Sequence, residues 1–165
     1  MDYTINMIEY KLKDKKGDII MKVDLQDVIE AIEFENEYLS HYYNKNTGVI
    51  IYKEDKDREP LNNLDLNTTE NFEDWQKELL MELKDLEEHP ENYIELPGHA
   101  ELHEGRMMKK FIDKYSIKTD ADENNIEALK KAIEAKALLS EWYDFREDLE
   151  REIAINWCER NNIEY

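Results

Sequence analysis

Residues 141–159, EWYDFREDLEREIAINWCE, decide the fold of this chain. Large apolar side chains recur along one side of a helix through this stretch, at Trp142, Phe145, Leu149, Ile153 and Trp157. The neighbouring positions Ala154, Ile155 and Cys158 widen that apolar face. A face this wide is typical of a helix surrounded by other elements. The stretch therefore predicts the central core helix.

Four other segments carry apolar residues at helical spacing. Asp24 has the character of an N-cap before a helix that extends to residue 36, and every charged residue of that helix is acidic. A second helix covers residues 70–88 and ends before Pro90. A third covers residues 101–115, with its first half weakened by Gly105. Asp120 and Glu123 resemble a capping box ahead of a fourth.

Two segments read as β-hairpins. In residues 3–23 two strand-like runs flank a polar turn, and in residues 38–52 two β-rich runs flank Asn44–Gly48, where Gly48 can take a positive φ. Residues 93–97 form a short extended segment closed by Pro97. The sequence therefore predicts an α+β fold, with two β-hairpins packed with about five helices in a single acidic domain over residues 1–165.

The charge of the chain restricts its partners. There are 41 Asp and Glu against 22 Lys and Arg, a net charge of −19 in 165 residues. This field repels nucleic acids and anionic membranes and attracts basic proteins. Because 41% of the residues are apolar, the chain should still fold. We expect the protein to bind a basic protein partner and to lie in the cytoplasm. We expect it to bind neither nucleic acid nor a membrane directly.

Two further observations favour the cytoplasm. Cys158 is the one cysteine, so no intrachain disulfide can form, as is usual in a reducing compartment. The first residues lack a basic region followed by an apolar run, and no apolar stretch approaches the ~20 residues of a membrane span.

Candidate chemistry is sparse. His99 and His103 are four residues apart, but no third metal ligand has a fixed spacing from them. Cys158 lies on an apolar helix and is expected to be a buried, inert thiol. The sequence therefore predicts no catalytic residue, no cofactor and no metal. His103, Glu104 and Arg106 are open to two interpretations, an ion-paired helix start or a site of unrecognised chemistry.

The acidic helices favour a binding role. A helix rises ~1.5 Å per residue, so acids at every third or fourth position place a charge every ~5 to 6 Å. Phosphates on each DNA strand are spaced ~3.4 Å apart along the helix axis. The charge spacing of the acidic helix and that of the DNA strand therefore agree within about a factor of two. We therefore predict that the acidic faces of helices 24–36 and 70–88 bind a basic protein, through Asp27, Glu30, Glu33, Glu78, Glu82 and Asp85.

Several blocks of the chain resemble a bacterial protein family of unknown function. They are VDLQDVIEAI (23–32), NKNTGVII (44–51), YIELP (93–97), HEGRMMKKF (103–111) and EWYDFREDLEREIAINWCERNNIEY (141–165). Members of that family carry a basic block rich in Gly, Arg and Phe before the position of Trp142, and this chain lacks it. The resemblance implies an architecture and no activity.

Three interpretations of function remain open. The preferred one is a non-enzymatic acidic protein-binding module that blocks or mimics nucleic acid at a basic nucleic-acid-binding protein. Phage-borne and mobile-element inhibitors of the anti-CRISPR and anti-restriction classes resemble this chain in being small, acidic and non-catalytic. In a second interpretation the acidic surface only keeps the protein soluble. The third is a bacterial housekeeping enzyme of unrecognised activity, built around His103, Glu104 and Arg106.

Overall fold

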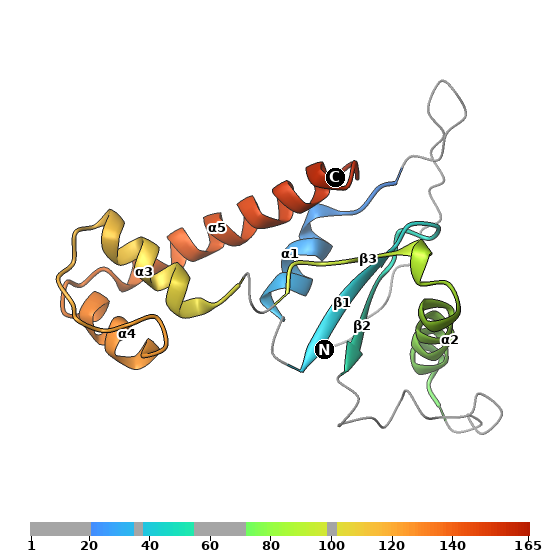
Figure 1. Ribbon diagram of the computed structural model, residues 1–165, viewed down its shortest axis with the longest axis horizontal. Helices are drawn as coiled ribbons and strands as arrows, with labels where there is room; N and C mark the ends of the chain where they lie inside the picture. The colour runs from blue at the N-terminus through green and yellow to red at the C-terminus, as the bar shows by residue number, and fades with distance from the viewer. Residues whose placement is uncertain (1–20, 35–37, 55–71, 99–101) are drawn as a thin grey trace.

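A computed structural model describes residues 21–34, 38–54, 72–98 and 102–165 (Figure 1). The helices of these residues are α1 (Leu25–Glu33), α2 (Asp74–Glu88), α3 (Glu104–Lys114), α4 (Ile126–Glu134) and α5 (Leu139–Arg160), with a 3-10 turn η3 (Pro90–Asn92). The strands are β1 (Leu39–Asn44), β2 (Ile50–Glu54) and β3 (Tyr93–Glu95). The predicted α+β class is confirmed. All but the last three residues of the first predicted hairpin lie outside the described residues.

The three strands form one antiparallel sheet in the order β2-β1-β3. Successive side chains of a strand point to opposite faces, so Tyr43 and Ile50 pack on one face with α1 and α5, while Tyr42 and Ile51 pack on the other with α2. Figure 1 shows the resulting layers, with α2 across the sheet from α1 and α5. The second predicted hairpin is confirmed, and Gly48 has the positive φ of +77° that its turn requires.

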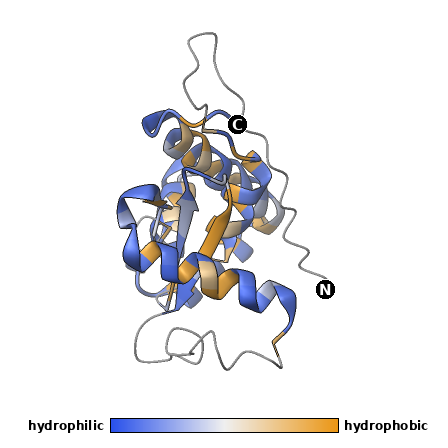
Figure 2. Ribbon diagram, turned by 90° about the vertical axis from the view of Figure 1, so that its right-hand side faces the viewer, coloured by the Kyte–Doolittle hydropathy of each residue, from blue (hydrophilic) through white to orange (hydrophobic). Residues whose placement is uncertain are grey.

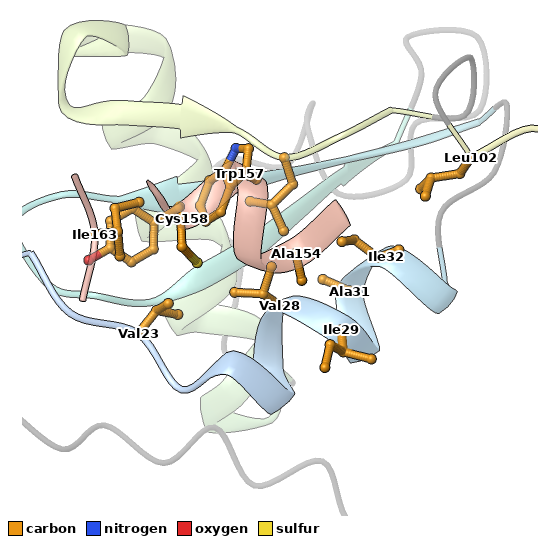
Figure 3. Packing of buried hydrophobic residues seen from close by; sticks show 12 residues of the cluster. Val23, Val28, Ile29, Ala31, Ile32, Leu102, Ala154, Trp157, Cys158 and Ile163 are labelled. Carbon is orange, nitrogen blue, oxygen red and sulfur yellow. The ribbon is translucent and has the colours of Figure 1, made fainter. Parts of the chain in front are cut away.

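Helix α5 connects two apolar clusters. The α1–α5 cluster contains Ala154, Trp157 and Cys158 from the C-terminal half of α5, and Figure 3 shows Ala154 and Cys158 directed toward Val28 of α1. The α3–α4 cluster contains Trp142 from the N-terminal half, packed with α3 and α4. The 22 residues of α5 span ~33 Å. The predicted central helix is confirmed.

Trp157 links α5 to the sheet. Its side chain is 4% exposed, and its Nε1–H donates to the backbone carbonyl of Glu95 at 2.9 Å. This bond satisfies a carbonyl of β3, a strand at the edge of the described sheet. The indole also meets the ring of Tyr43 edge-on, at 5.9 Å between centroids. One side chain therefore fixes α5 against two strands.

Two predicted helix starts are wrong, because local capping places them elsewhere. Helix α2 begins at Asp74, four residues after the predicted start, and the N–H of Glu73 donates to the side chain of Gln76 at 2.9 Å. Helix α4 begins after Asn125, whose side chain accepts from the N–H of Ala128 at 3.2 Å. Asn125 is the N-cap, and the predicted Asp120–Glu123 capping box does not form. Asp24 is confirmed as the N-cap of α1.

Gly105 is required for packing, although glycine has a low helix propensity. It lies in α3, in contact with the loop that precedes α4. A Cβ at this position would lie 1.6 Å from the backbone carbonyl oxygen of Glu123, a separation that the backbone cannot accept without moving. The glycine thus allows the close approach of the loop to α3.

Substitution of Gly105 by alanine should therefore destabilise the protein, although the same substitution usually stabilises a helix. Alanine is better than glycine by about 1 kcal/mol in a helix interior, yet we expect Gly105→Ala to lower the melting temperature because the loop must move away from α3. Thermal unfolding followed by circular dichroism measures the change. A melting temperature above that of the unsubstituted protein would show that the loop does not pack on Gly105.

Trp157→Ala should test the central position of α5. Removal of a large buried aromatic side chain costs about 3 to 5 kcal/mol, so we expect this variant to be strongly destabilised in urea unfolding. Trp75→Ala is the matched control, because Trp75 is 44% exposed. Equal effects of the two substitutions would contradict the described position of α5.

Candidate functional site

The acidic face of α1 consists of Asp27, Glu30 and Glu33. All three side chains are exposed, on the side of the helix opposite the buried Val28 and Ile32. No basic residue occurs within α1. None of the three carboxylates forms an ion pair with another described residue. The structure thus places this half of the predicted surface on one exposed strip.

Mutual repulsion within this face affects Asp27. Partial burial raises the pKa of Asp27, and the neighbouring charges of Asp24 and Glu30 raise it further. Asp27 lies three residues from each of them, the spacing at which side chains of a helix are neighbours. The folded state therefore disfavours the ionised form of Asp27 at neutral pH.

Asp27→Asn should consequently stabilise the protein. A pKa that is raised in the folded state means that folding favours the protonated form, so stability is lost as the pH rises through that pKa. We expect a higher melting temperature at pH 7 for Asp27→Asn, and a difference that narrows as the pH falls toward ~4, the ordinary range of aspartate. Asp148→Asn, at an exposed position of α5, is the control. A lower melting temperature at pH 7 would refute the repulsion.

The acidic face of α2 is divided between two environments. Glu78 is exposed, whereas Glu82 and Asp85 are half-buried and face the sheet. The hydroxyl of Tyr93 on β3 lies 2.8 Å from Oε2 of Glu82 and 2.9 Å from Oδ2 of Asp85. Asn44 on β1 donates from Nδ2 to the same Glu82 oxygen at 2.9 Å. The predicted residues Glu82 and Asp85 thus attach α2 to the sheet, a role that the sequence did not reveal.

The lysines near α2 pair with other carboxylates. Lys77 lies 3.5 Å from Asp74, Lys84 lies 3.9 Å from Glu88, and Lys53 of β2 lies 3.8 Å from Glu87. Glu78 has no ion pair among the described residues. Figure 2 views the molecule from the side of α2 and shows much of this helix as hydrophilic.

The two acidic faces lie on opposite sides of the molecule. Helices α1 and α2 both contact β2, one from each face of the sheet. Because each helix is about 10 to 12 Å across, their outer faces are more than ~20 Å apart. A single flat partner surface therefore cannot contact both faces at once.

Charge is unevenly distributed along the chain. Residues 72–98 carry nine acidic and two basic residues, whereas residues 102–138 carry seven acidic and eight basic ones. Several cations of α3 have intramolecular partners: Arg106 pairs with Glu123 at 3.7 Å, and Lys114 lies 4.9 Å from the centre of the Phe145 ring. Figure 1 shows α3 and α4 at the end of the molecule remote from α2. The segment that contains α2 and β3 is therefore much more acidic than the segment that contains α3 and α4.

His103, Glu104 and Arg106 lie together at the start of α3. His103 occupies the N-cap position and Glu104 the first turn, and Arg106 is directed to the half-exposed Glu123. His99 lies outside the described residues. Within the ranges that the structure describes, no group of three His, Cys, Asp or Glu side chains is arranged to hold a metal ion. A chemical role for these residues stays a prediction.

Cys158 is buried and unreactive by position. Its side chain is 0% exposed, and burial raises the pKa of the thiol to about 11. Because a thiol reacts as the thiolate, this side chain has a packing role. The predicted burial of Cys158 is confirmed.

Neither a family model, nor a curated protein, nor a solved structure matches the chain. The resemblance to an uncharacterised bacterial family therefore stays a prediction. Over the described part of the chain, no helix is both long enough and apolar enough to cross a bilayer. The argument for function consequently depends on the geometry and charge of the residues themselves.

The sequence missed one buried ion pair, formed by Arg146 and Glu150. The side chain of Glu150 is 6% exposed and accepts from Nε of Arg146 at 2.7 Å. Burial lowers the pKa of Arg146, but the hydrogen bond and charge of Glu150, with the charges of Glu104 and Glu33, raise it overall. Glu150 is four residues before Ala154, so its helical position could have indicated burial.

Proposed function

We propose that this protein is a non-enzymatic acidic module that binds a basic, nucleic-acid-binding protein and blocks its nucleic-acid site. One observation carries the proposal: the exposed acidic strip of α1 and the exposed Glu78 of α2 belong to helices on opposite sides of one thin sheet. A duplex nucleic acid likewise presents negative charge on both of its sides. This arrangement fits a basic channel with two walls better than it fits an open surface.

The retained repulsion on α1 supports a binding role. Like charges at helical neighbour spacing destabilise a helix by roughly 0.2 to 0.5 kcal/mol per pair. A surface that served solubility alone could alternate acids with lysines, as α4 does where Lys131 pairs with Glu127. On α1 the charges reinforce one another, which favours long-range attraction of a basic partner.

The uneven charge supports one orientation of binding. The nearly neutral α3–α4 segment gives a basic channel little to attract, whereas the α2 segment is strongly acidic. In this proposal α1 and α2 enter the channel and α3 and α4 remain outside. Inhibitors of the anti-CRISPR and anti-restriction classes act on proteins with such channels, which hold a duplex through basic side chains.

Cleavage assays test this function. The purified protein is added to plasmid cleavage by a guide-loaded Cas9-type nuclease and, separately, by a restriction endonuclease. We expect inhibition of one of them, weakened by salt because the attraction is electrostatic. Inhibition of neither would contradict the inhibitor class.

Charge reversals then locate the surface. We expect Glu30→Lys on α1 and Glu78→Lys on α2 each to weaken inhibition about tenfold, which corresponds to ~1.4 kcal/mol. Glu134→Lys on α4 is the matched control, because it changes the net charge equally at the remote end. Equal effects at all three positions would mean that total charge, and not these faces, determines binding.

A further inference from the structure

Helix α2 carries two large apolar side chains that the protein leaves exposed. Trp75 is 44% exposed and Met81 is 63% exposed. Among the described residues, no other helix carries two such side chains. Within the same described ranges, Trp75 forms neither an aromatic-ring contact nor a contact with a cation. Its indole ring is therefore accessible to a partner.

Glu78 lies between these two side chains on the surface of α2. It is three residues after Trp75 and three residues before Met81, and side chains at this spacing are neighbours, with Cβ atoms about 5 to 6 Å apart. Glu78 is exposed and forms no ion pair with a described residue. Both lysines of α2 are paired with other carboxylates of the helix. An aromatic ring, an unpaired carboxylate and a thioether thus follow one another along the helix.

We propose that these three residues, the Trp75 strip, bind an arginine side chain of the basic partner. The guanidinium stacks on the indole of Trp75 and donates hydrogen bonds to the carboxylate of Glu78, and the methylene stem packs on Met81. Arginine suits this strip because its planar cation both stacks on aromatic rings and pairs with carboxylates through two hydrogen bonds. Tryptophan is the aromatic side chain that attracts cations most strongly. The inference rests on the proposed function for its basic partner.

The charge of the surrounding segment favours this occupant over two others. Residues 72–98 carry nine acidic and two basic residues, so a cation is attracted to α2. A second copy of the chain would bring its own net charge of −19 to the same face and would be repelled. An uncharged apolar partner would cover Glu78 without pairing it, which costs free energy because a buried charge needs a partner.

Tryptophan fluorescence tests the proposal in the intact protein. Of the three tryptophans, Trp142 and Trp157 are buried, so the neutral quencher acrylamide reaches Trp75 preferentially. The probes are a short peptide of alternating Arg and Gly and the same peptide with Lys in place of Arg, both at low salt. We expect the arginine peptide to protect Trp75 from acrylamide and to bind about two- to fivefold more tightly than the lysine peptide, as an exposed cation–π contact allows. Equal affinities, or no protection by saturating arginine peptide, would overturn the proposal.

Trp75→Leu removes the ring and keeps the charge of the strip. We expect this variant to fold, as measured by circular dichroism, and to bind the two peptides equally. Tyr143→Leu is the matched control, because it removes an exposed aromatic side chain from α5 and should keep the preference for arginine. A preference retained in Trp75→Leu would overturn the proposal. Protection of Trp75 by a raised protein concentration alone would also overturn it, since a second copy would then occupy α2.

Glu78→Gln tests the carboxylate of the strip. We expect weaker binding of the arginine peptide, because the guanidinium loses its charged acceptor. Unchanged binding would contradict the proposal. The peptide assays contain no nuclease, so the two proposals can fail separately. Nuclease inhibition by a protein without an arginine preference would contradict this inference alone, and an arginine preference without inhibition would contradict the proposed function alone.

Discussion

The hydrogen bond from Trp157 to the carbonyl of Glu95 holds the structure together at its centre. It joins the longest helix to a three-residue strand that could not hold its place through one ladder of hydrogen bonds alone. Trp157 also contacts Tyr43, whose hydroxyl donates to the carbonyl of Lys22 at 2.9 Å. Burial raises the pKa of Tyr43 to about 12, so this donor keeps its hydrogen at physiological pH. Four separate segments of chain are thereby fixed around one indole ring.

This attachment explains how so acidic a chain maintains two opposed charged faces. Helices α1 and α5 are bound to one side of the sheet by apolar packing. Helix α2 is bound to the other side by apolar packing and by the contacts of Asn44 and Tyr93 with its Glu82 and Asp85. The repulsion between the faces acts across the sheet at more than ~20 Å, beyond the Debye length of ~8 Å at physiological salt. Repulsion within α1 acts at short range and remains. Repulsion between the two faces therefore costs little stability, whereas repulsion between neighbouring carboxylates within a face lowers it.

The predicted carboxylates of α2 are not equally available to a partner. Glu78 is exposed and available to a partner, whereas Glu82 and Asp85 are occupied by Tyr93. A partner that contacts α2 therefore meets Glu78, while Glu82 and Asp85 hold the helix on the sheet. On α1, all three predicted carboxylates are exposed. On this basis α1 provides the larger part of the predicted acidic surface.

Local patterns in the sequence determined the α+β class, the second hairpin with Gly48, the N-cap Asp24 and the buried face of α5. These features depend on residues close together in the chain, where turn chemistry and helical period are sufficient. The need for Gly105 could not be predicted in this way, because it depends on contact with a loop 18 residues further along the chain. The start of α4 is local, but Asp120 and Asn125 are both acceptable N-cap residues, and the pattern alone did not choose between them. The sequence likewise identified acidic helices but gave no sign that Glu82 and Asp85 turn toward Tyr93, or that α1 and α2 lie on opposite sides of the sheet. Only tertiary packing decides which carboxylates face solvent and which face a hydroxyl, since helical spacing fixes the side of a helix and not the neighbour that the side meets.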